Sequence, residues 1–251
     1  MSKIIAVVNQ KGGVGKTTSA VNLTAALREA GKRVLLCDFD PQANATSGMG
    51  VDKHRIKRSV YDVIIDQIPA ADVLIQTAYG DVLPSSADLA GAAVELLSLP
   101  EPNYRLKKAL DALRYRYDVI LIDCPPSLEL LTINGLAAAD SILIPVQCEY
   151  YALEGLADLM NTLRLMKKRI NPNLEIFGVL LTMFDGRTNF SNQVAQEVRR
   201  HFPGKVFATV VPRNVRLAEA PSHGLPITAY DRSSRGAQAY RDISEEFIKK
   251  L

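Results

Sequence analysis

Eight residues near the N-terminus have the types and order of a phosphate-binding loop: Lys11-Gly12-Gly13-Val14-Gly15-Lys16-Thr17-Thr18. They follow the apolar run 4–8 and precede a helix-compatible stretch, 17–30. A strand, a glycine-rich turn and a helix N-terminus together aim several backbone N–H groups and a positive dipole end at one anion. Lys16 can reach the outer phosphates of a nucleotide, and the Thr17 hydroxyl can complete the coordination of Mg²⁺. Because the flanking elements agree with the motif, the segment predicts a Mg-nucleotide site rather than a plain turn.

The loop departs from the general pattern GxxxxGK[ST] at its first position. That pattern has a glycine where this chain has Gln10, and a second lysine, Lys11, follows it. A lysine there cannot easily fold back onto phosphates that its own loop cradles. The departure therefore suggests that Lys11 serves a nucleotide held partly by another subunit.

Three aspartates at or just past the ends of apolar runs are candidates for metal binding and hydrolysis. Asp123 ends the run 119–122, where a carboxylate holds Mg²⁺ directly or through water. Asp40 lies just past the run 33–38, where it could orient the attacking water near a γ-phosphate. Asp38 either supports Mg²⁺ or anchors the turn that follows it, and the sequence leaves both roles open.

The elements that must position these residues follow an alternating pattern. Short runs rich in Val, Ile and Leu alternate with longer amphipathic stretches, which predicts an α/β fold with a mostly parallel twisted sheet flanked by helices on both faces. The predicted strands are 3–8, 33–38, 81–84, 118–123, 141–146, 176–183 and 206–210, and the predicted helices are 17–30, 104–115, 153–170, 189–202 and 236–250. Since ligands bind beyond the carboxyl ends of the strands of such sheets, the three aspartates should converge on the phosphate loop.

Length and composition set broad limits. The 251 residues are 47% hydrophobic with no linker-like stretch, which favours one domain over residues 1–251. Net charge is only +3, although 184–251 holds 11 Lys/Arg against 7 Asp/Glu, a modest hint of a basic face. No apolar run approaches the roughly 18 residues of a membrane span, and a strand starting at Lys3 leaves no room for a signal peptide. Three cysteines without CxxC spacing indicate buried reduced thiols and the cytosol.

Three segments together carry a resemblance to a known family. The loop at 11–18, Cys37-Asp38-Phe39-Asp40-Pro41-Gln42 and Ile120-Leu121-Ile122-Asp123-Cys124-Pro125-Pro126 resemble the ParA/Soj group of partitioning ATPases, P-loop NTPases of the MinD/ParA superfamily with a deviant Walker A motif. The segments 145–155 and 211–222 are similar to the chromosomal Soj-like branch. The resemblance runs from about residue 3 to the C-terminus.

The resemblance implies a function and a set of partners. It implies slow, partner-stimulated hydrolysis of ATP to ADP and phosphate with Mg²⁺, in an ATP-sandwich homodimer where Lys11 contacts the nucleotide of the other subunit. The dimer of such proteins binds double-stranded DNA without sequence preference and is released by a ParB-like centromere-binding protein. It further implies a cytoplasmic, nucleoid-associated protein for chromosome or plasmid segregation, with no membrane partner.

The resemblance also assigns further residues. It implies that Asp40 supports hydrolysis, that 41–50 and 124–127 are switch loops, and that Pro212, Arg213 and Asn214 cover the adenine. Arg187 and Arg216 match arginines implicated in DNA binding, because a guanidinium donates two parallel hydrogen bonds to phosphate. From the residues alone, salt bridges within the protein are at least as reasonable for both arginines.

Other functions occur on the same or a related scaffold, and small-molecule kinases or ligases remain open among them, although no acceptor-binding motif is apparent. A MinD-like membrane ATPase that positions cell division would carry an amphipathic C-terminal helix beyond the core, whereas 236–251 is predicted to be the last core helix. A nitrogenase iron protein would share a cluster between subunits through two cysteines each. Cys124 and Cys148 stand in no recognisable cluster context, so both alternatives are disfavoured.

Overall fold

A single seven-stranded sheet organises the chain. The computed structural model describes residues 2–127, 129–149 and 152–251, and orders the strands β3-β4-β2-β5-β1-β6-β7. Neighbouring strands are parallel except for the β3–β4 pair, which confirms the predicted mostly parallel sheet. The strands are β1 (Lys3–Val7), β2 (Val34–Asp38), β3 (Ile75–Thr77), β4 (Gly80–Leu83), β5 (Val119–Asp123), β6 (Ser141–Gln147) and β7 (Glu175–Thr182).

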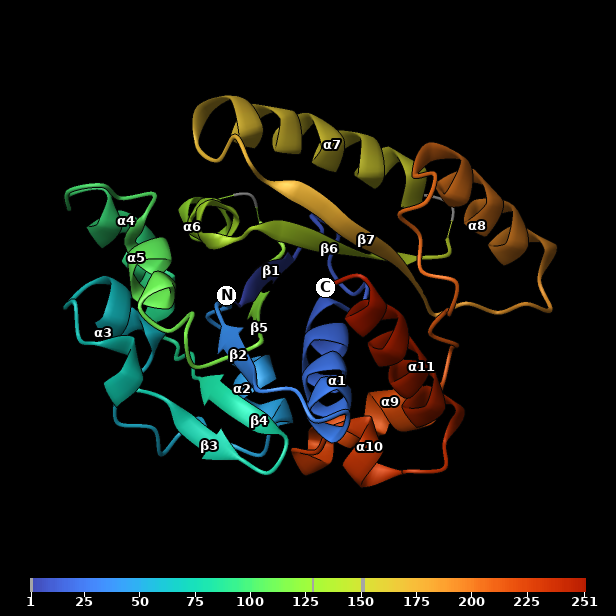
Figure 1. Cartoon of the computed structure of the whole chain (residues 1–251), viewed down its shortest axis with the longest axis horizontal. Helices are drawn as coiled ribbons and strands as arrows, with labels where there is room; N and C mark the ends of the chain where they lie inside the picture. Colours follow the sequence, from blue (N-terminus) through green and yellow to red (C-terminus); the bar gives the residue numbers. More distant parts are fainter. Residues whose placement is uncertain (1, 128, 150–151) are drawn as a thin grey trace.

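Helices cover both faces of this sheet (Figure 1). The α-helices are α1 (Lys16–Glu29), α2 (Asn44–Gly48), α3 (Val60–Ile64), α4 (Leu89–Leu96), α5 (Arg105–Asp111), α6 (Leu130–Ala138), α7 (Ala152–Arg169), α8 (Asn189–His201), α9 (Val215–Glu219), α10 (Ile227–Tyr230) and α11 (Arg235–Lys249). Two 3₁₀ turns, η1 (Ala70–Asp72) and η2 (Ala220–His223), complete the set. No helix in the described part of the chain is long and apolar enough to cross a membrane.

Alternation along the central strands divides the interior into two cores. In β1, Ile4 and Ala6 belong to the core that contains residues of α3 to α8, while Ile5 and Val7 belong to the core that contains residues of α1 and α11. Successive side chains of a strand point to opposite faces, so a strand buried on both faces must be apolar throughout. This explains why the central strands were recognisable as continuous apolar runs.

The strand order brings the candidate site together. β5 lies between β1 and β2, and in the parallel register Asp123 is the partner of both Val7 and Asp38. The loops that follow β1, β2 and β5 therefore leave the sheet at the same edge. This confirms the predicted convergence of the phosphate loop and the aspartates.

The predicted strand 206–210 is wrong. Only isolated bridges form in this region, Val179 with Val206 and Phe184 with Pro212. After Phe207, the backbone N–H groups of Ala208 and Thr209 donate to the carboxylate of Glu246 at 2.8 Å each. A side chain from α11 thus satisfies donors that a sheet ladder would otherwise have used.

Several short elements were not predicted. α3 begins with a capping box in which Ser59 accepts from Tyr61 N–H and Asp62 accepts from Ser59 N–H, a local signal that the sequence carries. β3 pairs with β4 through a tight hairpin in which Gly80 has φ +134°. Both elements are too short for hydrophobic periodicity to reveal them.

Candidate nucleotide-binding site

The phosphate loop joins β1 to α1 in a conformation that requires its glycines. Gly13 and Gly15 have φ values of +75° and +88°, which L-residues with a side chain rarely adopt. The hydroxyl of Thr182, at the end of β7, donates to the Val14 carbonyl at 2.8 Å and holds the loop from outside. Gln10, at the position where the general motif has glycine, donates to the Thr162 hydroxyl of α7 at 3.3 Å.

Lys16 is a buried cation beside the loop. It is 7% exposed, and its Nζ donates to the carbonyl of Lys11 at 3.1 Å. Burial lowers the pKa of Lys16, while the nearby charges of Asp123 and Asp40 act in the opposite direction. An ammonium group held this way is pre-positioned to donate to a phosphate that enters the loop.

Asp123 is suited to binding a metal ion. It is fully buried, and in the described structure neither carboxylate oxygen has a hydrogen-bond partner. Burial raises its pKa, and the Thr17 hydroxyl lies near enough to oppose the shift although no hydrogen bond of ordinary geometry joins them. A buried carboxylate without donors is costly unless a cation binds it. Among the described residues no three His, Cys, Asp or Glu side chains form a metal cluster.

Asp38 has different surroundings although it lies directly beside Asp123. One carboxylate oxygen accepts from both the N–H and the hydroxyl of Thr46, each at 2.7 Å, and the other accepts from Asp40 N–H at 3.3 Å. Burial raises the pKa of Asp38 to about 6, with the Thr46 hydrogen bonds opposing that rise. The geometry favours the anchoring role left open by the sequence, and a metal role for Asp38 stays a prediction.

The backbone of Asp40 is held from both sides. Its N–H donates to Asp38, and its carbonyl accepts from the Ser85 hydroxyl at 2.7 Å. Ser85 N–H in turn donates to the Thr46 hydroxyl at 3.0 Å. Thr46 lies within the predicted switch loop 41–50, whereas Ser85 belongs to no motif and follows a different strand, β4.

A cavity of about 370 Å³ opens beside the loop. The three residues predicted to cover the adenine line it, and so does the loop itself. Its lining includes Gly15, Thr18, Thr182, Met183, Pro212, Arg213, Asn214 and Tyr240. Asn214 also caps α9 by accepting from Arg216 N–H at 2.8 Å. The cavity is continuous with the phosphate loop through Gly15 and Thr18, so a base and its phosphates could share it.

Lys11 lies at the surface of the site beside an acidic residue that sequence analysis missed. Its Nζ is 3.9 Å from a Glu149 carboxylate oxygen, and Arg213 donates to the other Glu149 oxygen at 3.3 Å. The Lys11 side chain is one-third exposed, so this contact is weak and exchangeable. Tyr150 and Tyr151, within the family-like segment 145–155, lie outside the described residues.

Both arginines predicted to contact DNA are engaged in ion pairs. Arg187 makes a two-bonded pair with Asp185, at 2.9 and 2.7 Å, which lowers the pKa of Asp185 to about 2. Arg216 donates to Glu219 at 2.9 Å. These are the internal salt bridges that the sequence left open, but both guanidinium groups remain largely exposed. Exposed pairs contribute little stability and can exchange for phosphate.

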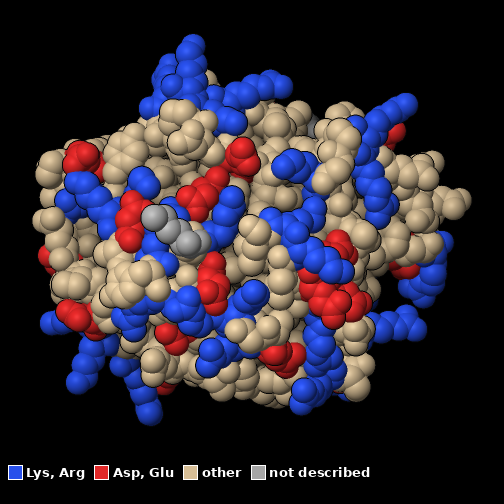
Figure 2. Space-filling model, in the orientation of Figure 1, with Lys and Arg blue, Asp and Glu red and all other residues tan. Residues whose placement is uncertain are grey.

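Charges of both signs are mixed on the face shown in Figure 2, where blue Lys and Arg side chains project around the rim and red Asp and Glu side chains lie among them. No single large basic area dominates this view. A contact with DNA on this face would therefore depend on particular groups rather than on a uniform field.

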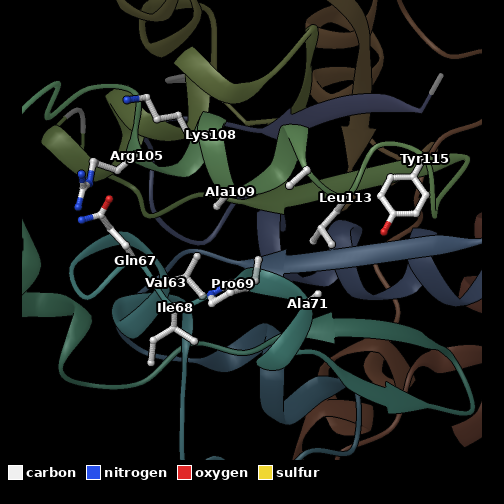
Figure 3. A pocket seen from close by; sticks show the side chains of 12 residues that line it. Val63, Gln67, Ile68, Pro69, Ala71, Arg105, Lys108, Ala109, Leu113 and Tyr115 are labelled. Carbon is white, nitrogen blue, oxygen red and sulfur yellow. The ribbon is translucent and has the colours of Figure 1, made fainter.

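A second cavity of about 370 Å³ lies apart from the nucleotide site, between α3, η1 and α5 (Figure 3). None of the residues predicted for the site lines it. Its buried cation, Arg105, donates to the carbonyls of Ile64 and Ile65 at 2.9 and 3.3 Å. Arg105 therefore closes the C-terminal end of α3, and the cavity needs no ligand to explain it.

The three cysteines are free and buried, as predicted. Cys124 and Cys148 are 1% and 2% exposed. A cluster shared between two subunits requires thiolates at the subunit surface, so these positions do not fit one.

Comparisons with known proteins agree with this geometry. The family model described as "AAA domain" matches residues 2–176. The sporulation initiation inhibitor protein Soj of Bacillus subtilis is 57% identical over 98% of both chains, and the chromosome partitioning protein ParA of Myxococcus xanthus is 50% identical over 100% of this chain and 89% of its own. A solved structure named cobyrinic acid a,c-diamide synthase of Mycobacterium smegmatis, with bound ATP analogue and magnesium, superposes with a TM-score of 0.87 at 37% identity over 99% of this chain and 95% of its own.

The hydrogen bonds around Thr46 give a stability prediction. Thr46→Val keeps the side-chain shape but removes the hydroxyl that bonds Asp38 and accepts from Ser85. We expect the free energy of unfolding to fall by about 1–3 kcal/mol, because two buried polar groups lose a partner. Urea unfolding measures this change. Thr46→Ser, which restores the hydroxyl, should recover most of the loss, and equal stability of wild type and Thr46→Val would contradict the assignment.

Proposed function

The chain belongs to the Soj/ParA family of chromosome-partitioning ATPases, which use ATP and Mg²⁺, and we propose that it acts as an ATP-dependent dimer on DNA. Two features together carry this proposal. One is the deviant phosphate loop with the partly exposed Lys11, and the other is the buried Asp123 carboxylate, which has no hydrogen-bond partner among the described residues. The relative from Myxococcus xanthus, at 50% identity, is named for chromosome partitioning. We treat residues 1–251 as one ATPase domain, since both cores share one sheet.

The nucleotide would be held by the loop and the start of α1. Backbone N–H groups of residues 12–18 bind phosphate oxygens, and Lys16 donates its buried ammonium to the outer phosphates. The Thr17 hydroxyl and the Asp123 carboxylate would bind the Mg²⁺ ion that accompanies the phosphates. Bound Mg²⁺ supplies charge neutralisation on the phosphoryl group. Pro212, Arg213 and Asn214 close over the base in the adjoining cavity.

Asp40 is the proposed residue for orienting the attacking water. Its backbone is fixed at both the N–H and the carbonyl, which sets the direction of its side chain. One carboxylate oxygen accepts from Gln42 N–H at 3.0 Å, so the other can hold a water molecule. Positioning of this kind supplies most of the protein's share in phosphoryl transfer.

Dimerisation would move Lys11 from Glu149 to the phosphates of the partner. Breaking the Lys11–Glu149 contact costs little free energy, because the contact is long and partly exposed. The gain is a charge-assisted bond to a phosphate that is excluded from water by the second subunit. Dimerisation thereby depends on ATP.

The dimer would bind double-stranded DNA without sequence preference through Arg187 and Arg216. Duplication across a two-fold axis doubles the phosphate contacts, so ATP controls DNA binding through valence. A ParB-like partner would stimulate hydrolysis and release the dimer, which would leave the protein cytoplasmic and associated with the nucleoid.

A MinD-like function is the alternative. The amphipathic face of α11 is buried in this protein, since Tyr240, Ile243 and Phe247 are at most 1% exposed. A helix whose apolar side is already packed against α1 has none left for a membrane surface. The 50% identity of the chain to a relative named for chromosome partitioning supports the DNA function over the membrane function.

Replacing each of the two loop lysines by alanine should abolish a different step. We expect Lys16→Ala to lose ATP binding, because no neighbour replaces its contact to phosphate. Lys11→Ala should bind ATP yet remain monomeric, because its target lies in the partner's site. Nucleotide titration and light scattering with ATP separate the two outcomes. The exposed Lys168→Ala in α7 serves as control, and an ATP-dependent dimer of Lys11→Ala would refute the cross-subunit contact.

Asp40→Ala should retain ATP binding and dimerisation but slow hydrolysis by about 10²-fold or more, because only water positioning is lost. Single-turnover hydrolysis measures the step. Asp40→Asn keeps the acceptor for Gln42 N–H and should be equally slow. Normal hydrolysis by Asp40→Asn would show that the Asp40 carboxylate takes no part in the reaction.

Arg187→Ala and Arg216→Ala should weaken DNA binding while ATP-dependent dimerisation persists. Binding by the wild type should fall steeply between about 50 and 200 mM salt, as expected when phosphate contacts dominate. Arg33→Ala is a matched control, because Arg33 is similarly exposed and paired with Asp118 at 2.7 Å. Equal DNA affinity of all three variants and wild type would show that these arginines do not bind DNA.

A further inference from the structure

A second basic surface lies far from the C-terminal quarter of the sequence. Residues 53–58, Lys53-His54-Arg55-Ile56-Lys57-Arg58, follow α2 and precede α3, and we call them the basic strip. Four of the six are lysine or arginine, with only Asp52 as an adjoining carboxylate. His54, Arg55, Lys57 and Arg58 are exposed. Short runs so rich in Lys and Arg are typical of nucleic-acid-binding patches.

The positive charge of the strip is poorly compensated within the protein. Arg55 lies 3.2 Å from Asp52, in a pair whose arginine is 87% exposed. No carboxylate in the described part of the chain lies within ion-pair distance of Lys57 or Arg58. This contrasts with Arg187 and Arg216, which are both paired. The strip therefore keeps free cations available for an external anion.

The strip forms one wall of a groove of about 820 Å³. Arg55 and Lys57 line it on one side, and the β3–β4 hairpin, residues 75–79, lines another. His223, Gly224 and Leu225, at and after the end of η2, also line it. Gly50 approaches Gly224 so closely that a Cβ on Gly50 would meet the Gly224 carbonyl at 3.4 Å. The groove is thus built by segments that pack tightly against each other.

A chain of contacts connects this groove to Arg216. The His223 ring stacks on Tyr230 with centroids 4.9 Å apart, and the Tyr230 hydroxyl donates to Glu219 at 3.2 Å. The same Glu219 oxygen accepts from Arg216. The groove and Arg216 therefore flank the same turn, η2.

We propose that the basic strip is a further contact surface for the phosphate backbone of duplex DNA, continuous with Arg216 across η2. This inference rests on the proposed function, in which the ATP-bound dimer binds DNA. Four of the six residues of the strip are lysine or arginine and none is Phe, Tyr or Trp, so we expect it to contact phosphates and add affinity without reading sequence. Each neutralised phosphate releases counterions, which is the source of that affinity.

The basic strip also contacts the loop that follows Asp40 at the nucleotide site. Lys53 donates to the carbonyl of Gln42 at 2.8 Å, in the loop that directly follows Asp40. A rearrangement of that loop on ATP binding would move the strip with it. Through this contact, nucleotide binding would alter the DNA-contacting surface within one subunit, in addition to its effect on dimerisation.

The test compares two double variants of the full chain with equal loss of charge. Arg55→Gln/Lys57→Gln removes the two cations that line the groove. Lys167→Gln/Lys168→Gln removes two exposed lysines in the last turn of α7, at the opposite edge of the molecule (Figure 1). All four residues are exposed at the surface, so neither variant should unfold, and thermal melting verifies this. Affinity for a labelled mixed-sequence duplex is measured with ATP and Mg²⁺ between about 50 and 200 mM salt.

We expect the slope of log affinity against log salt to become shallower by about 1.8 per protomer for Arg55→Gln/Lys57→Gln, since each phosphate contact contributes about 0.9. The α7 control should keep the wild-type slope. An unchanged slope in the strip variant, or an equal change in the control, would overturn the inference.

Two further outcomes separate this inference from others. If Arg216→Ala loses DNA binding while the strip variant binds normally, the proposed function stands and the strip is not a DNA contact. If the wild type with ATP does not bind the duplex, both fail. A polyglutamate peptide serves as a second probe: binding that the strip variant loses while its DNA slope stays unchanged would assign the groove to an acidic polypeptide instead.

Discussion

The buried charges at the carboxyl ends of three adjacent strands constrain the rest of this structure. Asp38 and Asp123 are register partners on β2 and β5, and Lys16 lies close enough to Asp123 to influence its charge. All three are nearly or fully buried. Burying charge is unfavourable unless partners compensate, and here the partners come from separate loops. The phosphate loop, the loop after β2 and the end of β5 must therefore stay together.

The two neighbouring carboxylates show how surroundings separate the roles of identical residues. Thr46 and Asp40 supply donors to Asp38, so it fixes a turn, whereas neither oxygen of Asp123 has a donor among the described residues and both suit a cation. The fixed turn then orients Asp40 with the help of Ser85. The Asp38 carboxylate thus positions the residue proposed for water activation, while the Asp123 carboxylate lies close to Lys16 of the phosphate loop.

Weak contacts at the protein surface lie between the buried charges of the nucleotide site and the surfaces proposed for partners. Lys11 rests against Glu149, and Lys53 holds the carbonyl of Gln42. Exposed contacts of this kind contribute little to folding stability. They can break at low cost when nucleotide, a second subunit or DNA offers a better partner, which is the property that a switch between states requires.

The sequence by itself determined the features that depend on local chemistry. Glycines, lysine and hydroxyl at fixed spacing define the phosphate loop, and continuous apolar runs define the central strands, since both signals lie within a few residues. The tertiary structure decided the role of Asp38, the anchoring of Asp40 by a serine 45 residues away, and the replacement of a strand at 206–210 by bonds to Glu246. It also decided that Arg187 and Arg216 pair with neighbouring carboxylates, whereas Lys57 and Arg58 of the basic strip have no ion pair with any described residue. These outcomes depend on donors and charges from distant segments, which only the order of the strands and the packing of the helices bring within bonding distance.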